Sequence, residues 1–316
     1  MRSDDRARGI AVKEAAVKEA LEAHVGRRHG RLRILSSGHT PVWLARSRGS
    51  AVIFKAPAEG VPALEAWACT RLRALGVPAP EVIAVANRTD TFPRGYLITK
   101  KLPGAPLREA GLSDERQRSV VRRAGGMLRK IHSAQIEGFG YPDTAHFNET
   151  GRVRGRQSSW KSAIEAMIEK QLSYLKGRDI LDTAAIDSIR QPFKRCESVL
   201  AARAQGSLLH GDFLARHILI SRPTKRITGI LDPAGMVIGD PVYDLAIFTL
   251  LSDEHIADLL DGYVLEESEK VDFELRLLLY RLLREVKELS WAAMAGGQAQ
   301  RGVERVRSAV ARINER

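Results

Sequence analysis

The sequence predicts an α+β protein in which a small antiparallel sheet precedes a larger, mainly helical part. Short apolar or β-branched runs bounded by Gly, Pro and Ser occupy residues 31–56 and recur at 82–102, as antiparallel strands require. After residue 113, apolar residues recur at spacings of three and four, which is typical of amphipathic helices. A chain of 316 residues can build two cores. We therefore place two lobes at residues 1–101 and 102–316.

The first lobe is predicted to contain two helices and five strands. Residues 9–24 alternate charged residues with Ala and Val at helical spacing. A second helix begins at Pro62 and ends before Gly76, because Pro favours the first helical position and Gly the position after the last. The expected strands are residues 31–36, 42–46, 51–56, 82–86 and 95–102.

The second lobe is predicted to be helical apart from one hairpin. Helices begin near Ser113 and Ser158, and another follows the capping pair Asp240 and Pro241. Residues 267–295 predict one long helix, which a short basic helix follows.

The hairpin brings polar side chains together. The runs HILI and ITGILD flank the Pro-containing turn SRPTKR, which is typical of two paired strands. If Ser221 pairs with Thr228, the antiparallel register places His217 opposite Asp232. Asp212 lies in the loop that enters the same end. We therefore expect two carboxylates and an imidazole to converge there.

Composition limits the classes of protein that the chain can belong to. No apolar run approaches the roughly 20 residues that cross a bilayer, and the N-terminus has no apolar signal-peptide core. We expect a soluble, cytoplasmic protein without membrane partners. Cys69 and Cys196 lack metal-binding spacing, so buried thiols are expected.

Charge does not by itself identify a partner. The net charge of +12 would suit a polyanion, but the arginines are scattered. The densest basic cluster, residues 152–161, matches no nucleic-acid module, so a nucleic acid is not expected. Residues 253–274 reverse the sign, with nine acidic residues and one base.

The polar residues of the hairpin have the chemistry that phosphoryl transfer requires. That reaction needs a group that accepts the proton of the attacking hydroxyl, ligands for a metal ion and a cation on the phosphates. Asp212 suits the first role, and His217 with Asp232 suits the second. Lys55, at the end of the third strand, suits the third, and Glu65 is placed to pair with it.

Two segments carry a resemblance to a known family. LLHGDFLARHILI followed by GILDPAGMVIGDPVYDLA resembles the aminoglycoside phosphotransferase family of small-molecule kinases, whose usual pattern is HGDxxxxN, then IDW or IDF, then GDPxxDLA. The resemblance extends over nearly the whole chain. It implies a two-lobed, protein-kinase-like fold that uses ATP or GTP with Mg²⁺ to phosphorylate a hydroxyl of a small molecule.

The resemblance also implies roles for individual residues. Asp212 would be the catalytic base, Asp232 a magnesium ligand and Lys55 the phosphate-binding lysine. The segments SSGHTP and KKL would contact the nucleotide, although the first is by default a plain hairpin turn. The nucleotide-binding positions in these two segments are Ser37, Gly38, Lys100, Lys101 and Leu102. His210 and Asp244 would brace the catalytic loop by hydrogen bonds.

Two positions depart from the family pattern. His217 replaces the usual Asn, as in macrolide phosphotransferases, although Mg²⁺ prefers oxygen ligands. The imidazole therefore ligates a metal through nitrogen, acts through a bound water or marks a loss of activity. Pro233 replaces the usual aromatic residue. In this respect the sequence is similar to streptomycin 6-phosphotransferases. The two departures indicate different substrate classes.

Three functions stay open at this point. The leading hypothesis is an O-phosphotransferase that acts on an antibiotic and confers resistance, as a monomer or homodimer. Acidic residues after GDPxxDLA would then line a pocket for a cationic acceptor, or simply form a solvated helix face: Asp253, Glu254, Asp258 and Asp261. The alternatives are a metabolic kinase for a sugar, amino alcohol or nucleoside, and an inactive pseudokinase or polyanion-binding protein.

Overall fold

The computed structural model describes residues 14–26, 32–36, 40–47, 50–57, 60–249, 255–297 and 299–315. The chain forms two compact units. Unit 1 comprises Met1–Val120 with Ala215–Ala234, and unit 2 comprises Val121–Leu214 with Gly235–Arg316. The segment around the predicted hairpin thus packs with the N-terminal part of the chain. The division of function at residues 101 and 102 stays a prediction.

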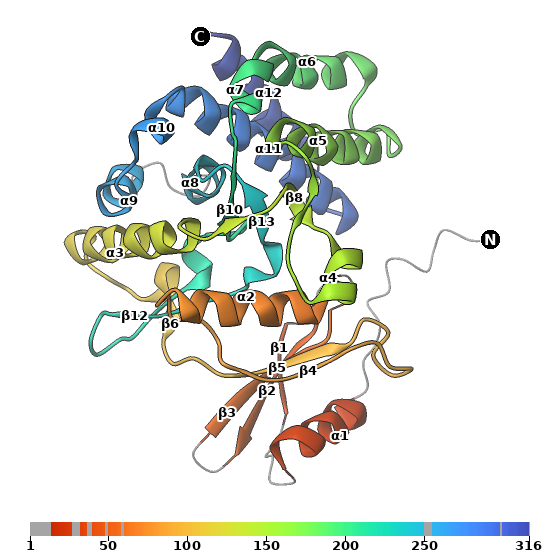
Figure 1. Ribbon diagram of the computed structural model, residues 1–316, viewed down its shortest axis with the longest axis vertical. Helices are drawn as coiled ribbons and strands as arrows, with labels where there is room; N and C mark the ends of the chain where they lie inside the picture. The colour runs from red at the N-terminus through yellow and green to blue at the C-terminus, as the bar shows by residue number, and fades with distance from the viewer. Residues whose placement is uncertain are drawn as a thin grey trace. The chain divides into compact units, whose positions relative to one another are not determined.

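Unit 1 contains a five-stranded antiparallel sheet in the order β1-β2-β3-β5-β4 (Figure 1). All five predicted strands are present: β1 (Arg33–Ser36), β2 (Val42–Ser47), β3 (Ser50–Lys55), β4 (Val82–Ala86) and β5 (Tyr96–Lys100). Gly95 precedes β5 with φ +81°, and a Cβ there would lie 2.0 Å from the carbonyl oxygen of Ala86. Only glycine can occupy that position without displacing the backbone.

Two helices accompany this sheet. Helix α1 (Glu14–Val25) buries Val17 and Leu21 in a cluster with the β3 residue Phe54. Helix α2 (Pro62–Ala74) begins at Pro62, as predicted, with acidic Glu65 in its first turn. An acidic side chain there interacts favourably with the helix dipole, and it also places a carboxylate at the start of the helix.

The predicted hairpin is present in unit 1, but its register was predicted wrongly. Strands β11 (Ile218–Ile220) and β12 (Ile227–Ile230) pair with Ile218 opposite Ile230, where the prediction placed residue 231. The amide of Ser221 donates to the carbonyl of Arg226, which closes a shorter turn than predicted. Lys225 in that turn takes a positive φ of 54°. The third strand of this sheet is β6 (Ala105–Pro106).

Unit 2 contains a second five-stranded sheet and most of the helices. The strand order is β7-β10-β13-β8-β9, with bounds β7 (Gln135–Ile136), β8 (Phe139–Pro142), β9 (Gly155–Gln157), β10 (Gly206–Leu209) and β13 (Val237–Gly239). Strands β10 and β13 are antiparallel, with Ser207 opposite Gly239. The loop that follows β10 and the loop that follows β13 therefore leave the sheet at opposite ends.

The helices of unit 2 include those that the periodicity predicted. The first, α3, begins in unit 1 and continues into unit 2. The helices are α3 (Asp114–His132), α4 (Thr144–Thr150), α5 (Trp160–Lys176), α6 (Thr183–Arg195), α7 (Glu197–Ala201), α8 (Val242–Thr249), α9 (Ile256–Tyr263), α10 (Glu267–Lys270), α11 (Phe273–Met294) and α12 (Gln300–Asn314). Short 3₁₀ turns are η1 (Leu107–Glu109), η2 (Ala215–His217) and η3 (Pro233–Gly235).

The single helix predicted over residues 267–295 is wrong. The chain breaks between α10 and α11, where Asp272 takes a left-handed φ of 50°. The Arg276 guanidinium donates to the carbonyls of Glu269 and Val271, and it thereby stabilises the break. Arg276 also donates to the carboxylate of Asp240, 36 residues away in sequence, and these contacts together outweigh the local helical pattern.

The core of unit 2 contains the apolar face of α5, the helix predicted to begin near Ser158. Trp160, Ile164 and Leu172 are buried among residues of α8 and α11. Gly239 lies against the Trp160 ring, where a Cβ would approach within 2.1 Å. Cys69 and Cys196 are free and buried, as expected. Among the described residues, no helix has both the length and the apolar character that a membrane span requires.

Candidate active site

Lys55 is held between two carboxylates in unit 1. It ends β3, and its Nζ lies 2.6 Å from Glu65 Oε1 and 3.1 Å from Asp232 Oδ1. The ion pair with Glu65 was predicted from sequence, whereas the contact with Asp232 was not. Burial alone would lower the pKa of Lys55, but the carboxylates of Glu65 and Asp232 outweigh it and raise that pKa above the ordinary lysine value. Lys55 is therefore a fixed cation.

Asp232 follows β12 and faces His217 as well as Lys55. His217 Nδ1 lies 3.8 Å from Asp232 Oδ2. The backbone amide of Leu231 donates to the carbonyl of His217, so the two residues stay adjacent despite the altered register. Asp232 has a positive φ of 62°, a conformation that Asp tolerates better than most residues. The hairpin thus places an imidazole beside a carboxylate, as the sequence predicted.

Arg216 fixes the protonation pattern of His217. Arg216 Nε lies 2.7 Å from His217 Nε2, and only the arginine nitrogen can donate in this pair. Nε2 of His217 therefore accepts, and the neutral imidazole carries its proton on Nδ1, which faces Asp232. Arg216 was not predicted as a site residue from the sequence.

Asp212 lies in unit 2, in a loop that Asp244 holds. Asp244 is fully buried in α8, and its two carboxylate oxygens accept the backbone amides of His210 (2.6 Å) and Gly211 (2.8 Å). Gly211 has φ +75°, and a Cβ there would lie 1.8 Å from the carbonyl oxygen of Gly235. The glycine of HGD is therefore required by the backbone. The bracing contact expected of Asp244 is present.

His210 also braces the loop. Its Nδ1 lies 3.3 Å from the backbone nitrogen of Asp212, which donates to it. Its side chain is buried and packs edge-on against Phe213. His210 is therefore a support for the loop.

His132, which was not predicted as a site residue, extends this support. Its Nε2 lies 3.0 Å from Asp244 Oδ2, and its Nδ1 lies 2.9 Å from the Tyr263 hydroxyl. His132 is buried at the end of α3, so the Asp244 carboxylate is screened from water. The position of His132 at the end of an apolar helix stripe was the feature of the sequence that could have indicated this role.

Arg284 contacts Asp212 directly and was not predicted as a site residue from the sequence. Its Nη2 lies 2.7 Å from Asp212 Oδ1, and its Nε lies 2.8 Å from Glu288 Oε1. The side chain is fully buried, with its guanidinium 4.9 Å from the centre of the Trp291 ring. Arg276, Tyr280 and Arg284 recur every four residues on the buried face of α11. Arginines on an apolar stripe were the signal that could have found this contact.

The segment predicted to hold the nucleotide base lies at the end of β5. Lys100 pairs with Glu81 at 2.6 Å, and its amide donates to the Glu81 carbonyl. The amide of Lys101 donates to the carbonyl of Ala51. Leu102 packs against Gly229, where a Cβ would lie 2.4 Å from Leu102 Cδ1. The role of these residues in nucleotide binding stays a prediction.

Two of the four acidic residues predicted to line the acceptor pocket pair with one arginine. Asp261 Oδ2 lies 2.6 Å from Arg122 Nε, and Asp258 Oδ1 lies 3.9 Å from Arg122 Nη2. These pairs join α9 to α3, whose backbones approach closely at Gly262. Four other predicted site residues lie outside the described residues: Ser37, Gly38, Asp253 and Glu254. Asp212 belongs to unit 2, whereas His217 and Asp232 belong to unit 1, and the predicted convergence of the three stays a prediction.

Comparison with known proteins decides the family. A family model described as the phosphotransferase enzyme family matches residues 31–278. The chain belongs to the phosphotransferase enzyme family. The matched region of this phosphotransferase includes both motif segments, from HGD to GDPxxDLA.

Solved structures share the fold of this phosphotransferase. A thermostable mutant of aminoglycoside phosphotransferase APH(4)-Ia is 18% identical, with 93% of this chain and 98% of that chain covered and a TM-score of 0.72. Aminoglycoside 2'-phosphotransferase-IIIa in its GDP complex is 18% identical, with 95% and 99% covered and a TM-score of 0.69. APH(2")-IIa with streptomycin and ATP is 16% identical, with 96% and 97% covered and a TM-score of 0.62. The expected protein-kinase-like fold is confirmed.

Proposed function

We propose that this phosphotransferase transfers the γ-phosphoryl group of ATP or GTP to a hydroxyl of a small antibiotic molecule. The observation that carries the proposal is the fixed Lys55 cation between Glu65 and Asp232 in a chain that also holds the HGD loop. A cation for phosphates and a carboxylate for metal are two of the parts that this reaction needs. The structures similar in fold include complexes with AMP-PNP and hygromycin B, with ATP and streptomycin, and with GDP.

Asp212 is proposed as the group that orients the acceptor hydroxyl and takes its proton. Its loop is fixed through Asp244, and its carboxylate is directed by Arg284. A base held at a defined position lowers the barrier by proximity as well as by proton transfer. Arg284 is proposed as a positioning residue, because it contacts Asp212 from a fully buried site.

The family implies Mg²⁺, and the residues of unit 1 fit it through Asp232. A carboxylate is the ligand type that Mg²⁺ prefers, and the Asp232 side chain is 44% exposed. Bound Mg²⁺ would neutralise charge on the nucleotide phosphates. Because Arg216 Nε donates to Nε2 of His217, we propose that His217 acts on the metal site through Nδ1, which lies 3.8 Å from Asp232 Oδ2. Groups next to a metal ligand commonly influence its orientation.

A metabolic small-molecule acceptor is the second candidate. Arg122 pairs with Asp258 and Asp261, and this pairing weakens the argument that acidic residues select a cationic acceptor. A sugar, an amino alcohol or a nucleoside is therefore kept beside antibiotics as an acceptor class.

An acceptor screen tests the proposal. ATP or GTP is supplied with aminoglycosides, macrolides, nucleoside antibiotics, sugars, amino alcohols and nucleosides, and nucleotide consumption is measured. Phosphorus and proton NMR then locate the phosphate on the product. Turnover of an antibiotic supports the first candidate, and turnover of simple metabolites alone supports the second. Both candidates are contradicted if, with every acceptor, the wild type consumes nucleotide no faster than the Asp212→Asn variant.

A further inference from the structure

The catalytic loop of unit 2 is connected to the segment that follows α9 through a series of buried side chains. Tyr263, the last residue of α9, is fully buried, and its hydroxyl lies 2.9 Å from Nδ1 of His132. Nε2 of the same imidazole lies 3.0 Å from Asp244 Oδ2, and Asp244 accepts two backbone amides of the HGD loop. Two side chains therefore join the Tyr263 hydroxyl to the backbone that carries Asp212.

Glu269 is the next member of the series. The Tyr263 hydroxyl donates to Glu269 Oε1 at 3.1 Å. Arg129 Nη1 donates to both oxygens of the same carboxylate, at 2.8 and 2.9 Å, and lies 3.2 Å from the Tyr263 hydroxyl. Glu269 is only 2% exposed, so water screens these contacts little. Hydrogen bonds to charged groups are strengthened in such surroundings.

The members of the series keep the protonation states that these hydrogen bonds require. Burial and the Glu269 carboxylate raise the pKa of Tyr263, so the hydroxyl keeps its proton at neutral pH. Burial alone would lower the pKa of Arg129, but its interactions with Tyr263 and Glu269 outweigh burial and raise that pKa. A neutral hydroxyl and a fixed cation therefore both donate to the Glu269 carboxylate.

Glu269 also fixes the position of the short helix α10. Its Oε2 accepts the backbone amide of Glu266 at 2.9 Å, which forms part of the capping box at the start of the helix. Arg129 pairs with the Glu266 side chain as well. The backbone carbonyl of Glu269 accepts from Arg276, whose Nη1 donates to Asp240. Two arginines thus hold α10 through hydrogen bonds and ion pairs.

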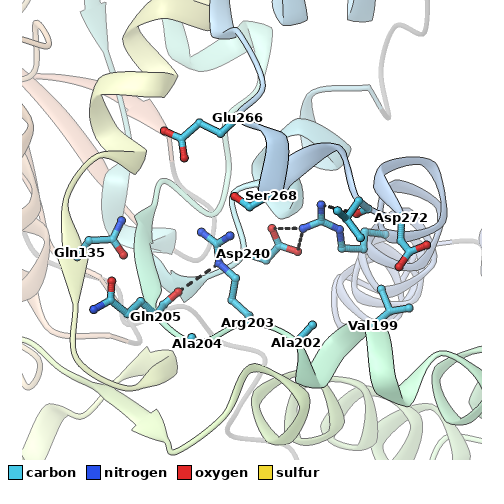
Figure 2. A pocket seen from close by; sticks show the side chains of 12 residues that line it. Gln135, Val199, Ala202, Arg203, Ala204, Gln205, Asp240, Glu266, Ser268 and Asp272 are labelled. Carbon is cyan, nitrogen blue, oxygen red and sulfur yellow. Dashed lines mark hydrogen bonds and ion pairs between the residues drawn. The ribbon is translucent and has the colours of Figure 1, made fainter.

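Apolar burial contributes little to this arrangement. Of the four residues of α10, all of which the structure describes, Glu269 alone is buried. A cavity of about 730 Å³ borders the helix, and Figure 2 shows Glu266 and Ser268 among the residues that line it. The position of α10 therefore depends on its polar contacts, and the buried carboxylate of Glu269 is central to them.

Backbone strain marks the turn that follows Tyr263. Val264 has a φ of +57°, which is uncommon for a β-branched residue, and its side chain is exposed. Such a conformation persists only where the surrounding contacts determine it, and strained residues are frequent at functional sites. The contacts of Tyr263 before the turn, and those of Glu266 and Glu269 after it, are the ones that hold this turn.

We propose that Tyr263 and Glu269 are positioning residues for phosphoryl transfer. They act through His132 and Asp244 on the backbone of the HGD loop, and they thereby determine where the Asp212 carboxylate lies. The effect on turnover rests on the proposed role of Asp212, whereas the effect on the loop backbone does not. A change at α10 is therefore transmitted to the catalytic loop.

Hydrogen exchange of the full chain, followed by NMR, tests the proposal without any substrate. Tyr263→Phe removes the hydroxyl and leaves the ring in place. The amides of His210 and Gly211 are expected to exchange at least about fivefold faster in this variant, because Asp244 is held less firmly. Tyr174→Phe is the matched control, since the Tyr174 hydroxyl in α5 is buried without a hydrogen-bond partner among the described residues. In the control the two loop amides exchange at the wild-type rate.

Steady-state kinetics tests the effect on the reaction, with the acceptor of the panel that the wild type phosphorylates fastest. Tyr263→Phe and Glu269→Gln are each expected to lower kcat about 5–20-fold, with less than about a twofold change in KM. The double variant should lose no more than the weaker of the two single variants, because both act along the same series. Glu269→Asp keeps the charge and recovers part of the loss. Glu267→Gln, at an exposed residue of α10, is the control and leaves kcat unchanged.

Four outcomes overturn the proposal. They are unchanged exchange of the two loop amides in Tyr263→Phe, equal acceleration in Tyr174→Phe, acceleration that extends equally to the amides of α5, and wild-type kcat in both Tyr263→Phe and Glu269→Gln. The third outcome would show only a global loss of stability. Wild-type turnover in Asp212→Asn contradicts the proposed function instead and leaves the exchange result unaffected, so the two failures are distinguishable.

Discussion

The Nη2 atom of Arg284 lies 2.7 Å from Oδ1 of Asp212, and the arginine side chain is fully buried. Burial alone would lower the pKa of Arg284. The carboxylates of Asp212 and Glu288 raise that pKa by more than burial lowers it, so the net shift is upward. The guanidinium is therefore charged, and its planar geometry directs the Asp212 carboxylate. A residue from α11 thus determines how the proposed base is presented.

Replacing Arg284 tests whether it positions the base. Arg284→Gln leaves the carboxylates of Asp212 and Glu288 without their shared cation, and we expect kcat to fall by about 10–100-fold with a smaller change in KM. Steady-state kinetics with the acceptor found in the screen measure both constants. Arg281→Gln, one turn away on α11, is the control, because Arg281 bonds Thr249. Equal losses in the two variants would show only a general effect on α11.

Asp212 itself is tested by two substitutions. Asp212→Ala is expected to lower kcat by about 10²–10⁴-fold, the usual range for a positioned general base. Asp212→Asn retains an oxygen that can accept from Arg284 but cannot take a proton, so a similar loss is expected. Thermal unfolding of both variants checks that the fold is intact. Wild-type turnover in Asp212→Asn would remove the residue from its proposed role.

Metal dependence separates the roles of Asp232 and His217. Asp232→Ala is expected to abolish the response of turnover to added Mg²⁺, because the proposed oxygen ligand is lost. His217→Asn retains a side-chain N–H that can donate to Asp232, so activity is expected to persist with an altered preference between Mg²⁺ and Mn²⁺. Titrations with each metal provide the measurement. Complete inactivation of His217→Asn would show that the imidazole has a function that an amide cannot supply.

The buried Asp244 carboxylate is predicted to stabilise unit 2. Asp244→Ala leaves the amides of His210 and Gly211 and the His132 ring without an acceptor. We expect the free energy of unfolding to fall by about 3–5 kcal/mol, as for a broken buried pair. Urea unfolding measures the change. Asp182→Ala, which removes an exposed N-cap of α6, is the control with an expected loss of about 1 kcal/mol.

Cys69 is predicted to be unreactive under conditions in which ordinary thiols react. Burial and the Glu65 carboxylate raise the pKa of Cys69 to about 12. In a Cys196→Ser background, alkylation by iodoacetamide should stay slow at about pH 9 in the folded protein and become fast in urea. Rapid alkylation of the folded chain at that pH would contradict the burial of this thiol.

The same shift predicts the sign of a stability change with pH. An unfolded thiol ionises near pH 8.5, below the raised pKa of about 12 in the folded protein. This stabilising contribution of Cys69 is therefore complete below about pH 8.5, and it is lost as the pH rises towards about 12. A Cys69→Ala variant should lose this part of the alkaline dependence of unfolding, which urea titrations at several pH values would measure.

Local pattern was sufficient for most elements and for the catalytic motifs. Short β-branched runs between turn residues predicted all five strands of the first sheet, and Pro62 marked the start of α2. The two segments from HGD to GDPxxDLA predicted the family, and the positions of Lys55 and Glu65 predicted one ion pair. Each strand, helix start and motif depends on spacing within a few residues, which can be read directly along the chain.

Other features depended on particular hydrogen bonds that the residue pattern does not indicate. The turn from Ser221 to Arg226 set the hairpin register, and Arg276 broke the helix predicted over residues 267–295. Both outcomes arise from hydrogen bonds whose geometry local propensity does not encode.

The sequence by itself determined that the chain is an α+β phosphotransferase with an Asp, a Lys and a second Asp available for the reaction. Only the tertiary structure decided which groups hold those side chains. Arg284 reaches Asp212 across 72 residues of sequence, and His132 reaches Asp244 across 112. Charged partners at such separations meet only when their helices pack, because no local periodicity links them.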